Sequence, residues 1–297
     1  MSDGTARVPT DRPLFSRRAV GSALVSIAAF TGLALITVGP SWPLTGPVLL
    51  QLLPALAALA GLFAGPAAVV GTVLGYLAYQ LFHGVFDPWL SLGYLAFGLA
   101  ASGLRNALDR PSDRGVDTDS GLGIRRTVAV VAVASLYVGT VTAWGYELTG
   151  RFQFFPTSVV LSINSFLSAV LLGGVGAAVL TRSTAIGRAL SRLRSSQPSL
   201  EPPADAGGRW PLAVVAVPVA WLCLGSIAAV GFYLIELVPA VHFRSRGLEP
   251  LLFLEQSWIF GRHGSKLQTA LGVTAMTLLV LALRRWRLNR PESDARN

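Results

Sequence analysis

Eight apolar segments dominate this sequence, and each is long enough to cross the hydrocarbon core of a lipid bilayer. A membrane-spanning helix needs about 20 apolar residues to cover roughly 30 Å. The chain is 52% hydrophobic and only 13% charged, a composition typical of membrane proteins rather than soluble domains. The pattern predicts an all-α fold, a polytopic membrane helix bundle of about eight transmembrane helices. The predicted spans are 19–38, 46–64, 66–82, 87–104, 127–148, 157–180, 211–237 and 267–283.

The positions of arginine predict how these spans are oriented. Loops on the cytoplasmic side of a membrane carry an excess of Lys and Arg. Most of the 24 Lys and Arg residues fall in four segments, which alternate correctly for eight spans: 1–18, 105–126, 182–210 and 284–297. We therefore expect a multi-pass protein of the cell membrane with both termini in the cytoplasm.

The spans and loops together suggest a division of the chain. After a cytoplasmic tail at 1–18, a six-helix membrane core is expected at 19–185. Residues 186–210 combine a basic amphipathic segment with a Pro- and Ala-rich linker, typical of a helix lying on the membrane surface. A two-helix module follows at 211–283, with an outer loop at 238–266, and a second cytoplasmic tail at 284–297.

Several function classes are disfavoured by the sequence. The net charge of +9 would suit nucleic acid, but the basic residues flank apolar spans and form no nucleic-acid motif. The sequence contains no phosphate loop and no zinc motif, and no pair of catalytic residues can be assigned inside a span. We therefore predict no enzyme activity, no cofactor and no metal site.

Glycine recurs in the second and third spans, in the stretch GLFAGPAAVVGTVLGYLAYQ at 61–80. Gly61/Gly65 and Gly71/Gly75 are small-xxx-small pairs, which allow close helix packing inside a membrane. The Gly65–Pro66 pair also predicts a tight turn between two helices.

With its flanks this stretch reads GPVLLQLLPALAALAGLFAGPAAVVGTVLGYLAYQLFHG, and a later segment reads FFPTSVVLSINSFLSAVLLGGVGAAVL. Over residues 19–185 the chain resembles the S components of energy-coupling factor (ECF) vitamin transporters, the substrate-binding membrane subunits of these importers. The resemblance implies a subunit that captures a small molecule and is energised by a transmembrane coupling subunit and ATPase subunits. It also implies docking of the coupling subunit on Ala19 and Ala23, and a small polar or aromatic ligand.

In that family the ligand lies near the outer face, between the loop after the first span and the outer ends of the fourth to sixth spans. The resemblance thus implies a substrate site made from polar and aromatic residues at these places: Trp42, Asp87, Trp89, Trp144, Tyr146, Glu147, Arg151 and Asn164. Each has a simpler interpretation. Trp and Tyr collect at membrane interfaces as anchors, and a carboxylate at a span end lies in water. Asn164, inside a span, requires a hydrogen-bond partner on another helix or on a ligand.

A weaker resemblance leads to a different function. The segment Trp42-Pro43-Leu44-Thr45-Gly46, ahead of a glycine-rich span, is similar to membrane-integral sensory domains of the MASE1 type. The alternative is therefore a membrane sensor, scaffold or assembly protein of unknown ligand that has no transport activity.

Overall fold

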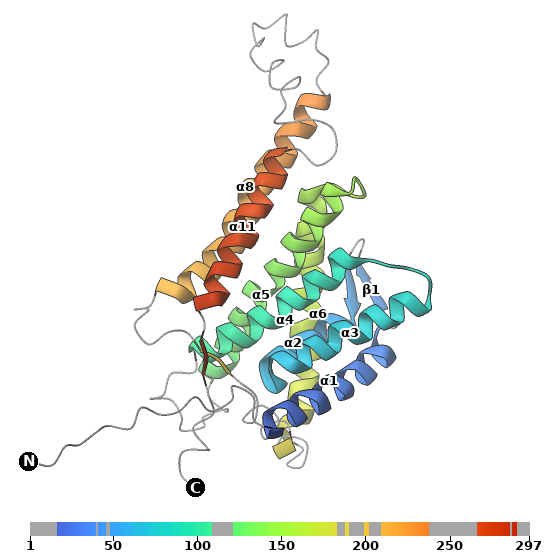
Figure 1. Ribbon diagram of the computed structural model, residues 1–297. Helices are drawn as coiled ribbons and strands as arrows, with labels where there is room; N and C mark the ends of the chain where they lie inside the picture. The colour runs from blue at the N-terminus through green and yellow to red at the C-terminus, as the bar shows by residue number, and fades with distance from the viewer. Residues whose placement is uncertain are drawn as a thin grey trace, which may run out of the picture.

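The chain is built mainly from α-helices in the part that a computed structural model describes. The described residues are 17–39, 41–45, 48–108, 121–182, 188–189, 199–201, 209–237, 266–285 and 287–289. Their helices are α1 (Arg17–Thr37), α2 (Leu52–Leu59) with a π-helical extension η1 (Ala60–Ala64), α3 (Pro66–Phe82), α4 (Pro88–Leu108), α5 (Gly121–Leu148), α6 (Phe154–Arg182), α8 (Arg209–Leu237) and α11 (Lys266–Arg285). Figure 1 shows α8 and α11 running side by side next to the bundle of α1 to α6.

Three of these helices are long and apolar enough to cross a membrane. The qualifying segments are Val20–Thr37, Ile124–Leu148 and Phe154–Ala178. Further apolar helices are shorter, among them Leu52–Ala64 and Pro66–Phe82. These lengths and compositions suit a membrane protein.

The prediction of a helix over all of residues 46–64 was wrong at its beginning. Residues Ser41–Thr45 and Val48–Gln51 form strands β1 and β2, which pair antiparallel, and the helix starts only at Leu52. The physical reason is that backbone N–H groups of β2 find side-chain acceptors on α6. A second antiparallel pair, β3 (Ser199–Glu201) with β4 (Arg287–Asn289), joins the predicted linker to the predicted C-terminal tail.

The glycines at 71 and 75 lie where α3 meets α1. A Cβ atom built on Gly71 would lie 2.5 Å from the Ile27 carbonyl oxygen, and one on Gly75 would lie 2.5 Å from that of Thr31. Gly61 abuts the backbone of Gly98 on α4 in the same way. The two backbones therefore approach each other closely at each of these contacts, as small residues permit.

Gly65 has a different role from the other three glycines. It adopts φ 93° between η1 and α3, and Pro66 occupies the first turn of α3. Because a positive φ is costly for residues with a Cβ, glycine suits the turn that the Gly65–Pro66 pair predicts.

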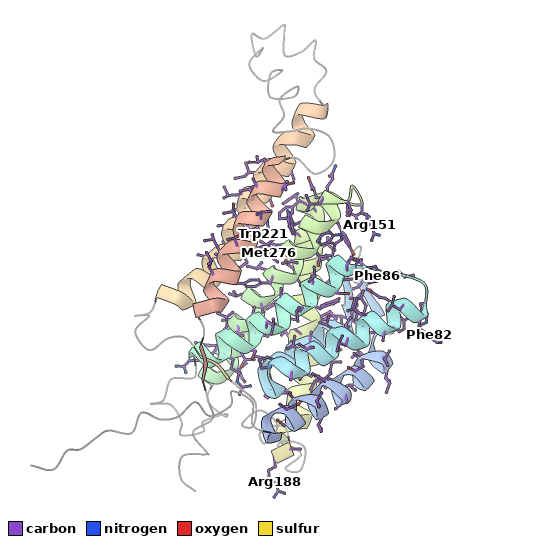
Figure 2. The ribbon with its side chains drawn as sticks, viewed as in Figure 1. Phe82, Phe86, Arg151, Arg188, Trp221 and Met276 are labelled. Atoms are coloured by element: carbon purple, nitrogen blue, oxygen red, sulfur yellow. The ribbon has the colours of Figure 1, made fainter. Side chains whose placement is uncertain are left out.

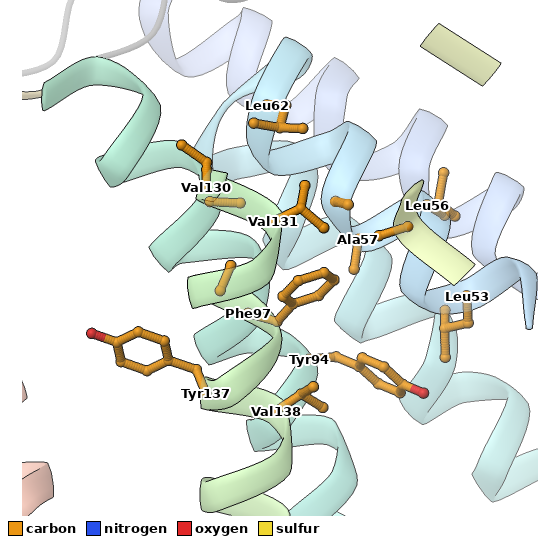
Figure 3. Close-up of a cluster of buried hydrophobic side chains, with 14 of the residues drawn as sticks. Leu53, Leu56, Ala57, Leu62, Tyr94, Phe97, Val130, Val131, Tyr137 and Val138 are labelled. Carbon is orange, nitrogen blue, oxygen red and sulfur yellow. The ribbon is translucent and has the colours of Figure 1, made fainter. Parts of the chain in front are cut away.

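The main core lies between α2, α4 and α5 (Figure 3). Phe97 is fully buried there among aliphatic side chains, and Tyr94 and Tyr137 belong to the same cluster. Labelled members of this cluster are Leu53, Leu56, Ala57, Leu62, Tyr94, Val130, Val131, Tyr137 and Val138.

Some predictions fall on residues outside the described part of the chain. These are most of the 1–18 tail, most of the 186–210 segment, the 238–266 loop up to residue 265, and the end of the 284–297 tail. The side chain of Ala19 also lies outside it, whereas Ala23 is half-buried on α1.

Candidate functional site

Asp87 and Tyr146, two residues predicted for the substrate site, are in contact. The hydroxyl of Tyr146, near the end of α5, donates a hydrogen bond to Oδ2 of Asp87. Asp87 directly precedes α4, and its Oδ1 accepts a hydrogen bond of 3.1 Å from the backbone N–H of Leu90. This is the geometry of a helix N-cap, and it fixes the carboxylate between α4 and α5.

Gln80 holds the backbone of Asp87 from α3. Its Oε1 accepts from the Asp87 N–H at 3.1 Å, and its Nε2 lies 3.4 Å from the Asp87 carbonyl oxygen. Gln80 is only 3% exposed. A buried amide with both ends engaged makes the loop between α3 and α4 a defined feature of this end of the bundle.

Trp89 and Trp144 lie on the side of this contact that faces α8. Their ring centroids are 6.0 Å apart in an edge-to-face arrangement, and Trp144 makes a similar contact of 5.8 Å with Trp221 of α8. Figure 2 labels Trp221 where α8 faces the core. Both predicted tryptophans are half-buried, and their ring contacts connect α4 and α5 with α8.

Glu147 and Arg151 occupy the turn between α5 and α6. The Glu147 carboxylate accepts a hydrogen bond from the backbone N–H of Phe154, the first residue of α6. Arg151 is exposed, and its backbone N–H donates to the Tyr146 carbonyl at 2.9 Å. Glu147 thus serves the start of α6, where a negative charge is favourable, while the guanidinium of Arg151 stays at the surface.

Asn164 lies away from that group and contacts the hairpin instead. Its Oδ1 accepts a hydrogen bond of 3.1 Å from the backbone N–H of Leu49 on β2. One turn further along α6, the hydroxyl of Ser168 accepts from the Gln51 N–H at 2.9 Å. Both α6 residues are buried. Phe166, the middle residue of the apolar segment Phe154–Ala178, lies between them in sequence.

A line of polar side chains connects the hairpin to the Asp87 end. The hydroxyl of Tyr94 lies 3.4 Å from Oε1 of Gln51 on β2. Tyr94 packs edge-to-face against Tyr76, with ring centroids 5.5 Å apart, and Tyr76 is one helical turn before Gln80. We call the group of Gln51, Tyr76, Gln80, Asp87, Tyr94, Tyr146, Asn164 and Ser168 the polar tract.

Sequence reasoning identified only Asp87, Tyr146 and Asn164 of the polar tract. Gln51 and Gln80 were missed, although an amide next to or inside an apolar helix is itself a signal. Trp42 lies on β1, but its side chain is outside the described residues. Within the described residues, no group of three His, Cys, Asp or Glu side chains could hold a metal ion.

Removing the Tyr146 hydroxyl tests the contact with Asp87. We expect Tyr146→Phe to lower the stability of the purified protein by about 1 kcal/mol, the usual contribution of one hydrogen bond, and to speed hydrogen exchange at Leu90. Tyr79→Phe is the matched control, because the Tyr79 hydroxyl has no hydrogen bond to the described residues. Equal effects of the two substitutions on thermal unfolding would contradict a stabilising Tyr146–Asp87 bond.

Comparison with known protein families, curated proteins and solved structures finds no match to this chain.

Proposed function

We propose that this chain is a substrate-capture subunit of a small-molecule importer, energised by a separate coupling subunit and ATPase subunits. The observation that carries the proposal is the β1–β2 hairpin, whose backbone is bound by Asn164 and Ser168 beside the middle of α6. The resemblance to S components implies a ligand site near the outer face, between the loop after the first span, in which this hairpin lies, and the outer ends of the fourth to sixth spans.

The proposed depth of the hairpin in the membrane is what points to a ligand site. Non-helical backbone at membrane depth is tolerated only where it is buried in protein or lines a water-filled cavity. Broken helices and intramembrane polar residues mark the substrate sites of many transporters. A hairpin that reaches the middle of a spanning helix, with polar side chains to satisfy it, is therefore best explained by a ligand site.

The length of the second helix supports the same depth. Leu52–Ala64 has 13 residues, which as a helix cover about 20 Å at 1.5 Å per residue. A bilayer core needs roughly 30 Å. In the proposed arrangement β2 supplies the remaining depth, so that the hairpin and α2 together make one crossing.

Eight crossings with both termini in the cytoplasm complete the proposal. Arg105 of α4 donates a hydrogen bond to the Leu62 carbonyl near the Gly65 turn, and Arg125 and Arg126 are exposed at the start of α5. These arginines favour the cytoplasm for that end of the bundle. Asp87 and Tyr146, at the opposite ends of α4 and α5, would then face outward.

The proposed ligand is small and carries polar or aromatic groups, because the polar tract offers amides, hydroxyls and a carboxylate beside tyrosine rings. A compact ligand held by a few convergent polar groups and aromatic walls is the usual pattern of a small-molecule site. In the bound state the ligand would replace some of the hydrogen bonds that the tract now makes with the hairpin.

The test is purification of the tagged full-length protein from its native membrane in a mild detergent. Mass spectrometry then identifies copurifying proteins and any small molecule released on denaturation. We expect a membrane coupling subunit, ATPase subunits with phosphate loops, and a released compound that an Asn164→Leu variant retains less well. Folded protein with neither partner nor compound would contradict the proposal and favour the sensor or scaffold alternative.

A further inference from the structure

The helix pair α8–α11 meets the ends of α5 and α6 through two contacts between a glycine and an aromatic ring. Gly272 of α11 lies against the Trp144 indole, and Gly225 of α8 lies against the Phe154 ring. A Cβ atom on Gly225 would be 2.6 Å from Cε1 of Phe154, and Phe154 is fully buried. Both contacts therefore require the absence of a side chain.

Gln268 links three helices at the same place. The indole Nε1 of Trp144 donates to the backbone oxygen of Gln268 at 3.0 Å. The side-chain Nε2 of Gln268 donates to the backbone oxygen of Gly225 at 2.6 Å. With 1% of its surface exposed, Gln268 is a buried amide in an apolar setting, where losing such bonds is costly. It joins α5, α8 and α11 into one unit.

Trp144 and Phe154, the two residues that the helix pair contacts, are neighbours of the Asp87 end of the polar tract. Trp144 packs on Trp89, two residues after Asp87, and precedes Tyr146 by two residues. Phe154 is the residue whose backbone N–H is bound by Glu147. The helix pair thus contacts Trp144, two residues before Tyr146, and Phe154, whose backbone N–H binds Glu147.

We propose that the α8–α11 pair positions the Asp87 end of the polar tract and the neighbouring Glu147: it holds the end of α5 and the start of α6 so that Tyr146 meets Asp87 and Glu147 meets the Phe154 N–H. Gly272, Gly225 and Gln268 are its positioning residues. This role lies beyond ligand capture itself, and it rests on the proposed function only in treating the polar tract as a ligand site.

The experiment is hydrogen exchange, followed by mass spectrometry, on the full-length protein in detergent micelles. Gly272→Leu places a side chain against the Trp144 ring, and Trp144→Phe removes the indole N–H while keeping an aromatic ring. We expect exchange at Leu90 and Phe154 to rise at least tenfold in Gly272→Leu and by a smaller factor in Trp144→Phe. Gly174→Leu on α6 is the matched control, since a Cβ there meets no atom of the described residues within 4 Å.

Two outcomes would overturn the proposal. Faster exchange confined to α8 and α11, with Leu90 and Phe154 at wild-type rates, would make the pair a peripheral attachment. A uniform increase that includes α3 would indicate general destabilisation instead of positioning. Trp144→Phe decides the question if Gly272→Leu does not fold. The readout requires no ligand, so failure of the proposed function would leave this result unaffected.

Discussion

Replacing Gly71 with leucine is expected to separate α1 from α3 and to lower the stability of the protein by about 3 kcal/mol, the upper part of the usual range for overpacked sites. The reason is that the new Cβ would meet backbone atoms of Ile27, at 2.5 Å from its oxygen and 2.8 Å from its Cα. Backbone atoms cannot move aside as a flexible side chain can. The whole of α1 would have to shift, and Thr31, which donates a hydrogen bond of 3.0 Å to the Gly71 carbonyl, would lose this bond.

The measurement is thermal unfolding of the purified variant in one detergent, where we expect the melting temperature to fall by several degrees. Gly32→Leu on α1 is the control, because in the part of the chain that the structure describes no atom lies within 4 Å of a Cβ at Gly32. If both variants unfold at the wild-type temperature, α1 does not pack on α3 through Gly71.

The second large effect is expected from Asn164→Leu, which releases the hairpin. The substitution keeps a side chain of similar size but leaves the Leu49 N–H without its acceptor, in a part-buried place beside the buried face of α6. An unsatisfied buried donor costs about 1–3 kcal/mol. Opening of the hairpin should therefore become about 5- to 150-fold more frequent, and exchange of the Leu49 and Gln51 amides should accelerate by the same factor.

Ser162→Ala is the matched control for this release. Ser162 lies on the same helix and is similarly buried, yet its Oγ has no hydrogen-bond partner among the described residues. Its removal should leave exchange in the hairpin unchanged. If the Leu49 amide of the Asn164→Leu variant exchanged at the wild-type rate, this hydrogen bond would not be what holds the hairpin.

The helices could be predicted from the sequence because apolar length alone decides them in a membrane protein. The segments expected to be helical at 66–82 and 211–237 correspond to α3 and, within two residues, to α8, and Gly65 of the expected Gly65–Pro66 turn has a positive φ. These features depend on local composition, which a single sequence contains. Among the helices that the structure describes, α1, α5 and α6 contain segments both long and apolar enough to cross a membrane.

The hairpin could not be predicted because its hydrogen bonds come from distant residues. Residues 48–50 are apolar, and apart from Gln51 the apolar run continues into α2, so that hydropathy alone favours one long helix. The acceptors for Leu49 and Gln51 are Asn164 and Ser168, more than a hundred positions further along the chain. Tertiary contacts of this kind override local propensity.

Only part of the candidate site could be predicted, again because its contacts join residues that are far apart in the sequence. Asp87 and Tyr146 were chosen because they end neighbouring spans, and their contact follows from the packing of α4 on α5. Gln268 was missed because its importance comes from contacts with Trp144 and Gly225, on helices whose mutual placement the sequence does not reveal.

The depth of the hairpin is the central claim, and one measurement tests it most directly. A nitroxide spin label is attached at Leu50→Cys in a Cys223→Ser background, which removes the chain's only cysteine, and the protein is reconstituted in lipid bilayers. Its accessibility to oxygen and to a water-soluble paramagnetic complex is compared with that of a label at Phe86→Cys, which is 56% exposed in the wild type. Our account predicts that the label at Leu50 is shielded from the water-soluble complex, and that Asn164→Leu increases its exposure. A label at Leu50 that is as accessible as the one at Phe86 would place the hairpin at the membrane surface and contradict the account.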